Sequence, residues 1–239
     1  MIVLVTGNLA PDSHVISLKI AERKERLREY EKTLSFLNTA KYVDKMVFCE
    51  NSGQISAVEE LRKRTEHFSS KLEILSFQGN NEKVLEQGKG YGEGEIIEYA
   101  LKNSALLHSE REFIKLTGRI TIENLDAIIS KMQPGKMYFN PVRIYGKDHQ
   151  IDTKFYKVPT ECYRQYFSQL YKEVKDAENV FIEHLFWQCI REKKLLCANT
   201  PEYPRYRGKS ASTGQDYGTN NVKYEIKNIM CKLGIYKNY

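Results

Sequence analysis

The sequence lacks the features that mark several large protein classes. No apolar run approaches the roughly 18 residues of a membrane-spanning helix. The cysteines are odd in number, are irregularly spaced and contain no CxxC pair: Cys49, Cys162, Cys189, Cys197 and Cys231. This spacing gives no support to a disulfide framework or a zinc site, so we expect free thiols in a reducing cytoplasm.

The amino-terminal apolar run, MIVLVTGNL, has no basic flank before it and no small-residue cleavage site after it. Because a signal peptide has both features, we expect this run to be a first core strand. Apolar residues make up 41% of the 239 residues and charged residues 28%. These values are typical of an ordinary globular protein with a single α/β domain.

The net charge of +6 is unevenly distributed along the chain. From Tyr203 to the end there are seven basic residues and two acidic ones. A basic tail favours an anionic surface nearby, either a membrane leaflet or a phosphate-bearing ligand. We therefore expect a cytoplasmic protein for which an anionic membrane surface, at the inner face of the plasma membrane, is a candidate partner.

Apolar runs and amphipathic stretches alternate along the first half of the chain. β-Branched or aromatic runs that end in turn residues predict strands at 2–6, 42–50, 72–77 and 113–116. Helical spacing of apolar residues predicts helices over 14–40, 55–67 and 96–107. This alternation predicts a mainly parallel sheet with flanking helices, whose functional loops lie at the carboxyl ends of the strands.

The second half of the chain changes character. Two runs around the turn at 146–148 predict paired strands over 137–145 and 151–158. Further helices are predicted over 160–175, 180–193 and 222–233. The stretch 201–221 has little periodicity, and we expect it to be a mobile loop.

Two of the predicted strands end in turns that suit a ligand. The first ends in Thr6-Gly7-Asn8, where small residues would let a ligand approach the backbone, although a plain turn is the simpler interpretation. The second ends in Glu50-Asn51-Ser52. Its carboxylate could accept a hydrogen bond from a ribose hydroxyl or a uracil N–H, and an Asx-type turn explains the same residues equally well.

A third feature is the run of alternating glycines at 88, 90, 92 and 94, directly before a predicted helix. Lys89 and Gly90 in this run could bring backbone N–H groups close to a phosphate or a sugar, since a helix amino terminus favours anions. A flexible connection is the alternative. The spacing is neither GxGxxG nor a Walker motif, which disfavours a Rossmann dehydrogenase and a P-loop ATPase.

In its order of elements and its turn chemistry, the chain from Met1 to Lys193 resembles the family-2-type glycosyltransferases. Glu50-Asn51-Ser52 matches the acidic-Asn-Ser-type turn of that family, and Gly88 to Leu107 leads into FIKLTGR as its glycine-containing stretch leads into the donor-site strand. FIKLTGR with a downstream carboxylate helix is also similar to uncharacterised transferases encoded with bacterial surface-polysaccharide genes.

The resemblance implies the glycosyltransferase A fold, a Rossmann-like α/β fold, in a single domain over 1–239. It implies a donor half over 1–119 and an acceptor half over 120–200, followed by a loop and a basic helix over 201–239. The implied reaction moves a sugar from a nucleotide-sugar donor, a UDP-sugar, to a saccharide or lipid-linked saccharide acceptor in capsule or O-antigen synthesis.

The chain departs from that family at one position. The family usually ends its fourth strand with Asp-x-Asp, whose carboxylates hold a divalent metal against the donor diphosphate, whereas this chain has Thr117-Gly118-Arg119 after Lys115. Arg119 is a permanently charged fork that suits phosphate oxygens, so we expect it to stabilise the leaving group in place of the metal. We therefore predict no metal site and no cofactor. A surface ion pair for Arg119 and a solvated position for Lys115 are the plain alternatives.

The predicted helix NVFIEHLFWQCI is strongly apolar except at Glu183-His184. Glu183 matches the family's catalytic base by its order along the chain, and in an inverting transfer that base takes the proton of the acceptor hydroxyl. His184 could orient the acceptor, or it could be a core histidine with satisfied hydrogen bonds. Asp152 and Tyr156 in the predicted hairpin could contact acceptor hydroxyls, although Asp152 also suits a turn cap.

Two other functions remain open. A retaining transferase or a sugar nucleotidyltransferase could use a related fold, although the latter usually has a glycine-rich loop with basic residues directly after the first strand, which is absent at 7–10. A nucleic-acid-binding module would explain why tyrosines alternate with basic residues over 203–217. The first 200 residues are not strongly basic and contain no recognised binding motif, so we expect no nucleic acid as a partner.

Overall fold

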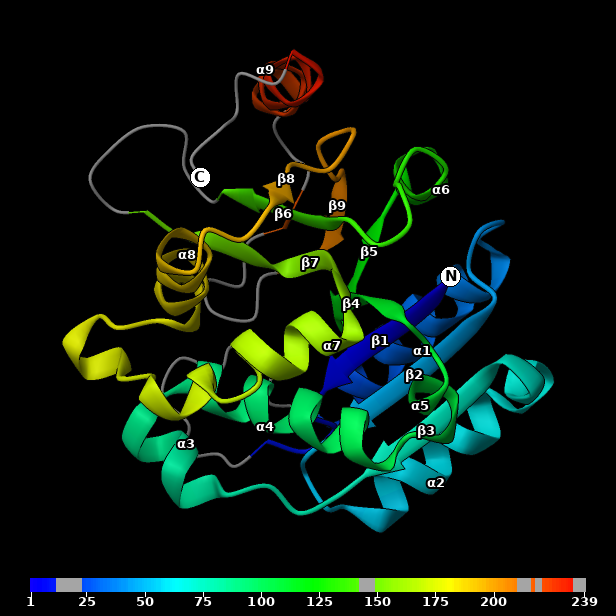
Figure 1. Ribbon diagram of the computed structural model, residues 1–239. Helices are drawn as coiled ribbons and strands as arrows, with labels where there is room; N and C mark the ends of the chain where they lie inside the picture. Colours follow the sequence, from blue (N-terminus) through cyan, green and yellow to red (C-terminus); the bar gives the residue numbers. More distant parts are fainter. Residues whose placement is uncertain (12–22, 142–148, 210–215, 218–220, 234–239) are drawn as a thin grey trace.

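The computed structural model describes residues 1–11, 23–141, 149–209, 216–217 and 221–233 (Figure 1). Within this part of the chain, seven strands form one mixed sheet in the order β3-β2-β1-β4-β7-β6-β8. The bounds of the seven strands are β1 Ile2–Gly7, β2 Lys45–Glu50, β3 Leu72–Ser76, β4 Glu112–Thr117, β6 Met137–Pro141, β7 Ile151–Pro159 and β8 Cys197–Ala198. The strands β1 to β4 are mutually parallel, β7 is antiparallel to β4, and β6 is antiparallel to β7. The predicted α/β class with a mainly parallel sheet is confirmed.

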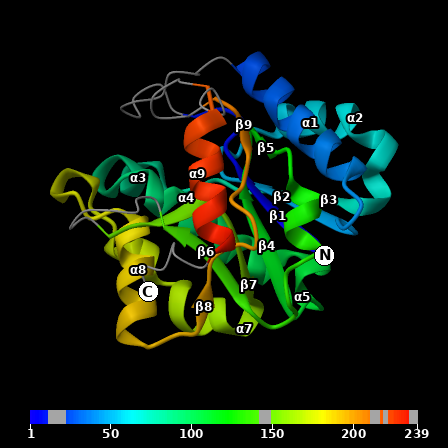
Figure 2. The same cartoon turned by 90° about the horizontal axis from the view of Figure 1, so that it is seen from above.

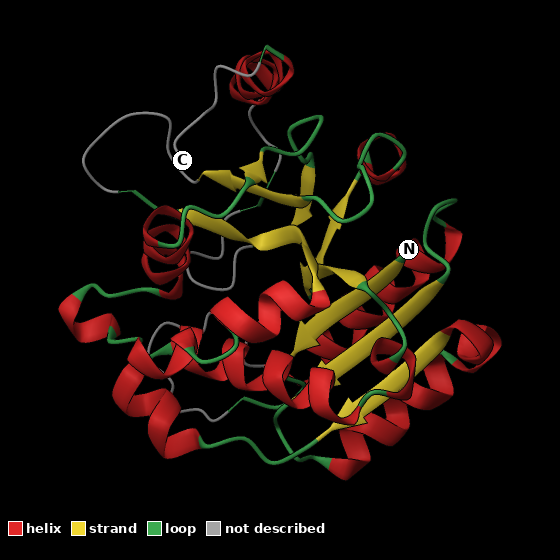
Figure 3. Cartoon of the chain, viewed as in Figure 1, coloured by secondary structure: helices red, strands yellow, loops and turns green. Residues whose placement is uncertain are grey.

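Helices cover both faces of the sheet (Figures 1 and 3). The main ones are α1 Arg23–Thr39 and α2 Ile55–Arg64 on one face, and α4 Lys89–Asn103, α5 Ala105–His108 and α8 Ile182–Glu192 on the other. Along β1, Val3 and Val5 pack in the core under α1 and α2, whereas Ile2 and Leu4 pack in the core under α4 and α8. This alternation follows from the two-residue period of a strand, and burial on both faces explains why β1 reads as a continuous apolar run.

The strand order reverses beside β1. The chain proceeds outward from β1 to β2 and β3, then returns through α4 to place β4 on the other side of β1. Thr6 lies opposite Thr117 in the parallel ladder, and the N–H of Gly118 donates to the carbonyl of Thr6 at 2.9 Å. The carboxyl ends of β1 and β4 therefore flank a topological switch point, which is where open α/β sheets bind ligands.

A second, two-stranded sheet joins the carboxyl-terminal third to the end of β4. β5 (Ile120–Ile122) pairs antiparallel with β9 (Tyr206–Gly208), and Ile120 lies opposite Gly208. The predicted loop over 201–221 thus contains a strand at 206–208, while 210–215 and 218–220 lie outside the described residues. A β-carbon at Gly208 would lie 2.5 Å from the carbonyl oxygen of Arg119, so only glycine permits this approach.

The glycine run differs from its prediction as well. Gly90, Gly92 and Gly94 lie inside α4, which begins at Lys89 and follows the short α3 (Asn81–Gln87). A β-carbon at Gly94 would lie 2.1 Å from the β-carbon of Tyr171, and one at Gly90 would lie 3.0 Å from that of Ile182. These glycines allow α4 to pack closely against its neighbours, so the run is neither a phosphate loop nor a flexible connection.

The remaining described elements are short except for the last helix. The predicted helix over 160–175 is broken into α7 Thr160–Cys162, a π-helical segment Tyr163–Phe167 and a 3-10 turn Leu170–Glu173. Two further 3-10 turns lie at Glu66–Lys71 and Asp176–Glu178, and α6 spans Leu125–Ile129. α9 (Asn221–Lys232) lies at the outside of the molecule, end-on in Figure 1 and lengthwise in Figure 2. No helix among the described residues has the length and apolar character needed to cross a bilayer.

Candidate functional site

The two turns at the switch point are packed beneath a tyrosine of α1. A β-carbon at Gly7 would lie 2.6 Å from the ring of Phe48, and one at Gly118 would lie 2.4 Å from the ring of Tyr30. The hydroxyl of Tyr30 accepts a hydrogen bond from the N–H of Asn8 at 2.8 Å and donates to the carbonyl of Asn8 at 3.2 Å. Small residues at these turns therefore allow α1 to approach the ends of β1 and β4.

Two buried guanidinium groups lie beside these turns. Arg26, only 3% exposed, donates from Nε to the carbonyl of Asn8 at 2.8 Å. Arg119, 7% exposed, donates from Nη1 to Oε2 of Glu29 at 3.1 Å. Burial lowers the pKa of Arg26, and repulsion from Arg119 acts in the same direction. The two guanidinium groups are therefore close enough to repel each other.

Lys89, the first residue of α4, is a third cation at this place. Burial lowers the pKa of Lys89; attraction by Asp176 opposes this, and repulsion from Arg119 and Arg26 adds to it. We call Arg26, Lys89 and Arg119 the cation cluster. Glu29 and Asp176 offset part of this positive charge, and the three cations together make the cluster a candidate site for a negatively charged ligand.

The backbone at Arg119 is strained. Its φ of 71° lies in the left-handed region, which non-glycine residues rarely adopt and which costs of order 1–3 kcal/mol. Neighbouring contacts hold the residue there, namely the ion pair with Glu29 and the close approach of Gly208 to its carbonyl. Strain of this kind gathers at functional sites, where it fixes the direction of a side chain.

A polar network lies between α4 and the carboxyl ends of β1 and β4. Glu93 of α4 accepts hydrogen bonds from Thr117 at 3.3 Å and from Thr6 at 3.5 Å, and it forms an ion pair with Lys115. Lys115, fully buried, also donates to Oγ1 of Thr117 at 2.7 Å and to the carbonyl of Thr153 at 2.7 Å. Burial lowers the pKa of Lys115, and the carboxylates of Glu183 and Asp152 oppose this effect. The predicted residues Thr6, Lys115 and Thr117 are thus brought together, and Lys115 is not a solvated strand residue.

Glu183 lies at the other end of this network. It is half-buried and accepts a hydrogen bond from Oγ1 of Thr153 at 3.0 Å. The adjacent His184 has a local structural role, because its Nδ1 accepts from the N–H of Phe181 at 3.2 Å at the start of α8. Its Nε2 lies 3.0 Å from Nε2 of Gln150.

The other predicted acceptor contacts lie in less accessible places. Asp152, 3% exposed, accepts from the backbone N–H of Lys154 at 2.9 Å and from the hydroxyl of Tyr206 at 3.1 Å. Tyr156, 1% exposed, stacks on Phe139 with 4.7 Å between ring centroids. Asp152 therefore anchors β9 to β7, and Tyr156 is a core residue. Their burial argues against direct contact with an acceptor.

The predicted recognition turn at the end of β2 binds its own backbone. Glu50 is fully buried, accepts from the N–H of Ser52 at 2.8 Å and of Leu9 at 3.3 Å, and is also hydrogen-bonded by the hydroxyl of Ser76. The side chain of Asn8 donates to Oδ1 of Asn51 at 2.9 Å. The structure thus joins the two predicted turns, but these bonds favour the turn interpretation of Glu50 over ribose recognition.

The amino terminus of α4 already has an anionic partner. The carboxylate of Asp176 accepts from the N–H of Lys89 at 3.2 Å, at the position where we expected a phosphate. Gly88, with a φ of 113°, makes room for it, since a β-carbon there would lie 2.0 Å from the Asp176 carboxyl carbon. Burial raises the pKa of Asp176. The amino terminus of α4 is therefore capped by a carboxylate of the protein itself.

Sequence reasoning missed Arg26, Tyr30 and Glu93. Arg26 and Tyr30 are four residues apart on α1, and Lys89 and Glu93 are four apart on α4, so each pair shares one helical face. That spacing was the available signal. The spacing does not by itself show which charged residue of α1 turns inward.

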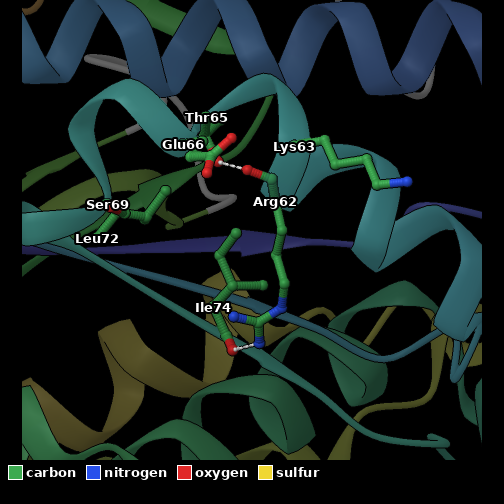
Figure 4. Close-up of a pocket in the computed structure, with 7 residues that line it drawn as sticks. All are labelled: Arg62, Lys63, Thr65, Glu66, Ser69, Leu72 and Ile74. Carbon is green, nitrogen blue, oxygen red and sulfur yellow. Dashed lines mark hydrogen bonds between the residues drawn. The ribbon is translucent and has the colours of Figure 1, made fainter.

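Two cavities in the described part of the chain lie apart from the cation cluster. The larger, about 290 Å³, lies at the outer strand β3 (Figure 4), where Arg62 donates to the carbonyl of Ile74 at 2.6 Å. The smaller, about 10 Å³, is lined by Glu93, Lys115 and Tyr156 among others and has room for about one water molecule. The described residues contain no group of three or more His, Cys, Asp or Glu side chains placed to hold a metal ion.

No protein-family model matches the chain, and no curated protein matches it. Among solved structures, the chain is similar to the 4-diphosphocytidyl-2C-methyl-D-erythritol synthase of Anaerococcus prevotii, with 10% identity, 99% and 96% of the two chains covered and a TM-score of 0.45. It is similar to the nucleoside-diphosphate-sugar pyrophosphorylase of Vibrio cholerae, with 13% identity, 84% and 91% coverage and a TM-score of 0.46.

A third similar structure is the glycosyltransferase GlyE of Streptococcus pneumoniae, with 10% identity and a TM-score of 0.49. The match covers 83% of this chain but only 44% of that one. At such identities the likeness concerns the path of the backbone and not the residues of a site. The cation cluster and the network below it must therefore be interpreted from their own chemistry.

Proposed function

We propose that the chain is a glycosyltransferase that moves a sugar from a nucleotide-diphosphate donor, a UDP-sugar, to a saccharide acceptor. The supporting observation is the cation cluster at the carboxyl ends of β1 and β4. A diphosphate carries negative charge on each phosphoryl group, and it would be attracted by the positive charges of Arg26, Lys89 and Arg119. Guanidinium groups also match phosphate oxygens in geometry.

In this proposal the cation cluster supplies the electrostatic part of catalysis. The bond between the anomeric carbon and the diphosphate oxygen breaks, and its electron pair stays on the diphosphate. Fixed positive groups that face this developing charge lower the barrier, because they need no reorganisation at the moment of reaction. Arg119 is held in a single direction by its strained backbone and by Glu29, so it suits that role.

Glu183 is the proposed base for an inverting transfer. It would take the proton of the acceptor hydroxyl while that oxygen attacks the anomeric carbon. The buried pair of Lys115 and Glu93, with Thr153 between Lys115 and Glu183, links the base to the end of β4. Lys115 and Glu93 are then positioning residues, since the hydrogen bonds of both are already used within the protein.

The finer parts of the proposal follow the sequence resemblance. They are a uridine donor, a saccharide or lipid-linked saccharide acceptor, a role in capsule or O-antigen synthesis, and transfer that needs no divalent metal. A nucleotide sugar would lie with its base toward the joined turns of Asn8 and Asn51 and its sugar toward Glu183. Asn8, which is half-buried, is the more open of these two turn residues.

The deciding experiment is a screen of the full chain with nucleotide sugars and oligosaccharide acceptors, in which each released product is identified. Release of a nucleotide diphosphate together with an extended acceptor supports the proposal. Pyrophosphate release from a nucleoside triphosphate and a sugar phosphate would assign a nucleotidyltransferase instead. A thermal shift with single-stranded RNA and none with nucleotide diphosphates would assign a nucleic-acid-binding module.

A further inference from the structure

The helix α9 has two opposite faces with different surroundings. Tyr224, Asn228 and Cys231 form the face toward the domain: Asn228 and Cys231 are each 8% exposed, and Oδ1 of Asn228 accepts from the N–H of Tyr203 at 3.1 Å. These residues recur at steps of four and three, so they lie on one side of the helix. α9 is therefore docked on the domain through a partly polar face.

The opposite face of α9 carries large aliphatic side chains that the domain does not cover. Val222 is 71% exposed, Ile226 53%, Ile229 54% and Leu233, directly after the helix, 66%. At 100° per residue these four positions fall close to 180° away from the docked face. We call them the α9 stripe. The last helix, which lies across the outside of the domain in Figure 2, is thus docked on the domain and still presents an apolar surface outward.

The charges of α9 distinguish the occupants of this surface. The helix contains Lys223, Lys227 and Lys232 and a single acidic residue, Glu225, which is already paired with Arg205 at 3.1 Å. The whole chain has a net charge of +6. Two copies of this face would bring like charges together, whereas an anionic lipid surface attracts them. Lys227 donates to the hydroxyl of Tyr203 at 2.9 Å on the docked side, whereas Lys232 is exposed. A helix with an apolar face and an excess of basic residues has the pattern of one that lies in a membrane interface.

We propose that α9 docks the protein on an anionic membrane surface, with the α9 stripe at the boundary between headgroups and acyl chains. This docking is independent of the proposed transfer reaction, because α9 contributes no residue to the cation cluster or to Glu183. Each basic residue near an anionic surface strengthens partition about fivefold, and salt screens this effect.

Sedimentation of the full chain with lipid vesicles tests the proposal. One set of vesicles contains equal parts of phosphatidylglycerol and phosphatidylcholine, the other phosphatidylcholine alone. The double variant Ile226→Ser/Ile229→Ser removes the centre of the α9 stripe. The matched control, Ile55→Ser/Leu85→Ser, removes two aliphatic side chains that are equally open to solvent, 73% and 49% exposed, on other helices.

We expect the wild type and the control to bind the anionic vesicles and to be released by 1 M salt, and we expect the α9 variant to partition at least tenfold more weakly. Both variants should keep the wild-type melting temperature, since all four side chains are exposed. The proposal is overturned if the wild type does not sediment with anionic vesicles, or if it binds both vesicle types equally and this binding does not depend on salt. It is likewise overturned if the control loses as much binding as the α9 variant. It is also overturned if the wild type dimerises in solution and the α9 variant does not, because the stripe would then face a second copy.

Discussion

Replacement of Arg119 by glycine separates the chemical contribution of the residue from its contribution to folding. Arg119 has a φ of 71°, and a residue with a β-carbon in this conformation costs roughly 1–2 kcal/mol relative to glycine. Arg119→Gly removes that cost and also removes the ion pair with Glu29, a side chain that is 17% exposed and can reach water. The two effects are opposite in sign, so we expect the free energy of unfolding to change by no more than about 1 kcal/mol.

The effect of Arg119→Gly on transfer should be much larger. Arg119 is 7% exposed, so its attraction for a diphosphate is little screened by water. Loss of one fixed donor to a developing oxyanion costs about 2.7–4 kcal/mol, or a factor of about 10²–10³ in kcat. Arg26 and Lys89 remain in the variant and should keep the nucleotide bound, so KM for the donor should change less than kcat.

The assay is steady-state release of nucleotide diphosphate, combined with chemical denaturation of the same samples. Lys194→Gly is the matched control, because Lys194 is also a basic residue in the left-handed region, with a φ of 51°, but is exposed and lies away from the cation cluster. It should gain stability and keep full activity. If Arg119→Gly retains kcat within threefold of wild type, Arg119 does not stabilise the leaving group. An equal loss in Lys194→Gly would show that relief of backbone strain, rather than loss of the charge, causes the effect.

Three further predictions concern the base, the metal and the packing of α4. Glu183→Gln keeps the hydrogen bond from Thr153 but cannot take a proton, so kcat should fall about 10²–10⁴-fold. The nucleotide affinity, measured by calorimetry, should not change. The control Glu161→Gln, at a side chain that is 89% exposed, should remain active. Transfer should continue in excess chelator, and full loss of activity that manganese or magnesium restores would contradict the role given to Arg119. Gly94→Ala places a β-carbon 2.1 Å from that of Tyr171, so it should lower the free energy of unfolding by about 1–3 kcal/mol in urea denaturation, and an unchanged midpoint would show that α4 can move aside.

Much of the first half of the fold could be predicted because its signals are local. The apolar runs of β1 to β4 end in turn residues, and each predicted strand overlaps the observed one. The pairing of β5 with β9 could not be predicted, because it joins three-residue segments that are more than eighty positions apart and depends on the tertiary approach of Gly208 to Arg119. The break after α7 has a similar origin, since Tyr163 and Phe167 both turn into the core.

The candidate site was only partly predictable for a related reason. Arg119 and Lys89 lie beside turn and glycine residues, so the sequence alone indicates that they could contact a ligand. Arg26 lies in a charged amphipathic stretch, where a sequence pattern cannot show which basic residue turns inward. For Glu50 the residue type was informative but the partner was not, because a carboxylate at a strand end can serve a ligand or the N–H groups of its own turn, and here it serves the turn.

The contact between Gly208 and the carbonyl of Arg119 determines which positions of the carboxyl-terminal third can tolerate substitution. Residues 206–208 pack against the backbone at Arg119 and help to hold its side chain in one direction. Substitutions there should therefore be as restricted as those in a catalytic loop. Tyr217 supports the same segment, because its N–H donates to the carbonyl of Gly208 at 2.8 Å and its ring centroid lies 6.0 Å from that of Tyr206. A mutational scan scored by transfer activity should therefore find low tolerance both at 206–208 and at Tyr217.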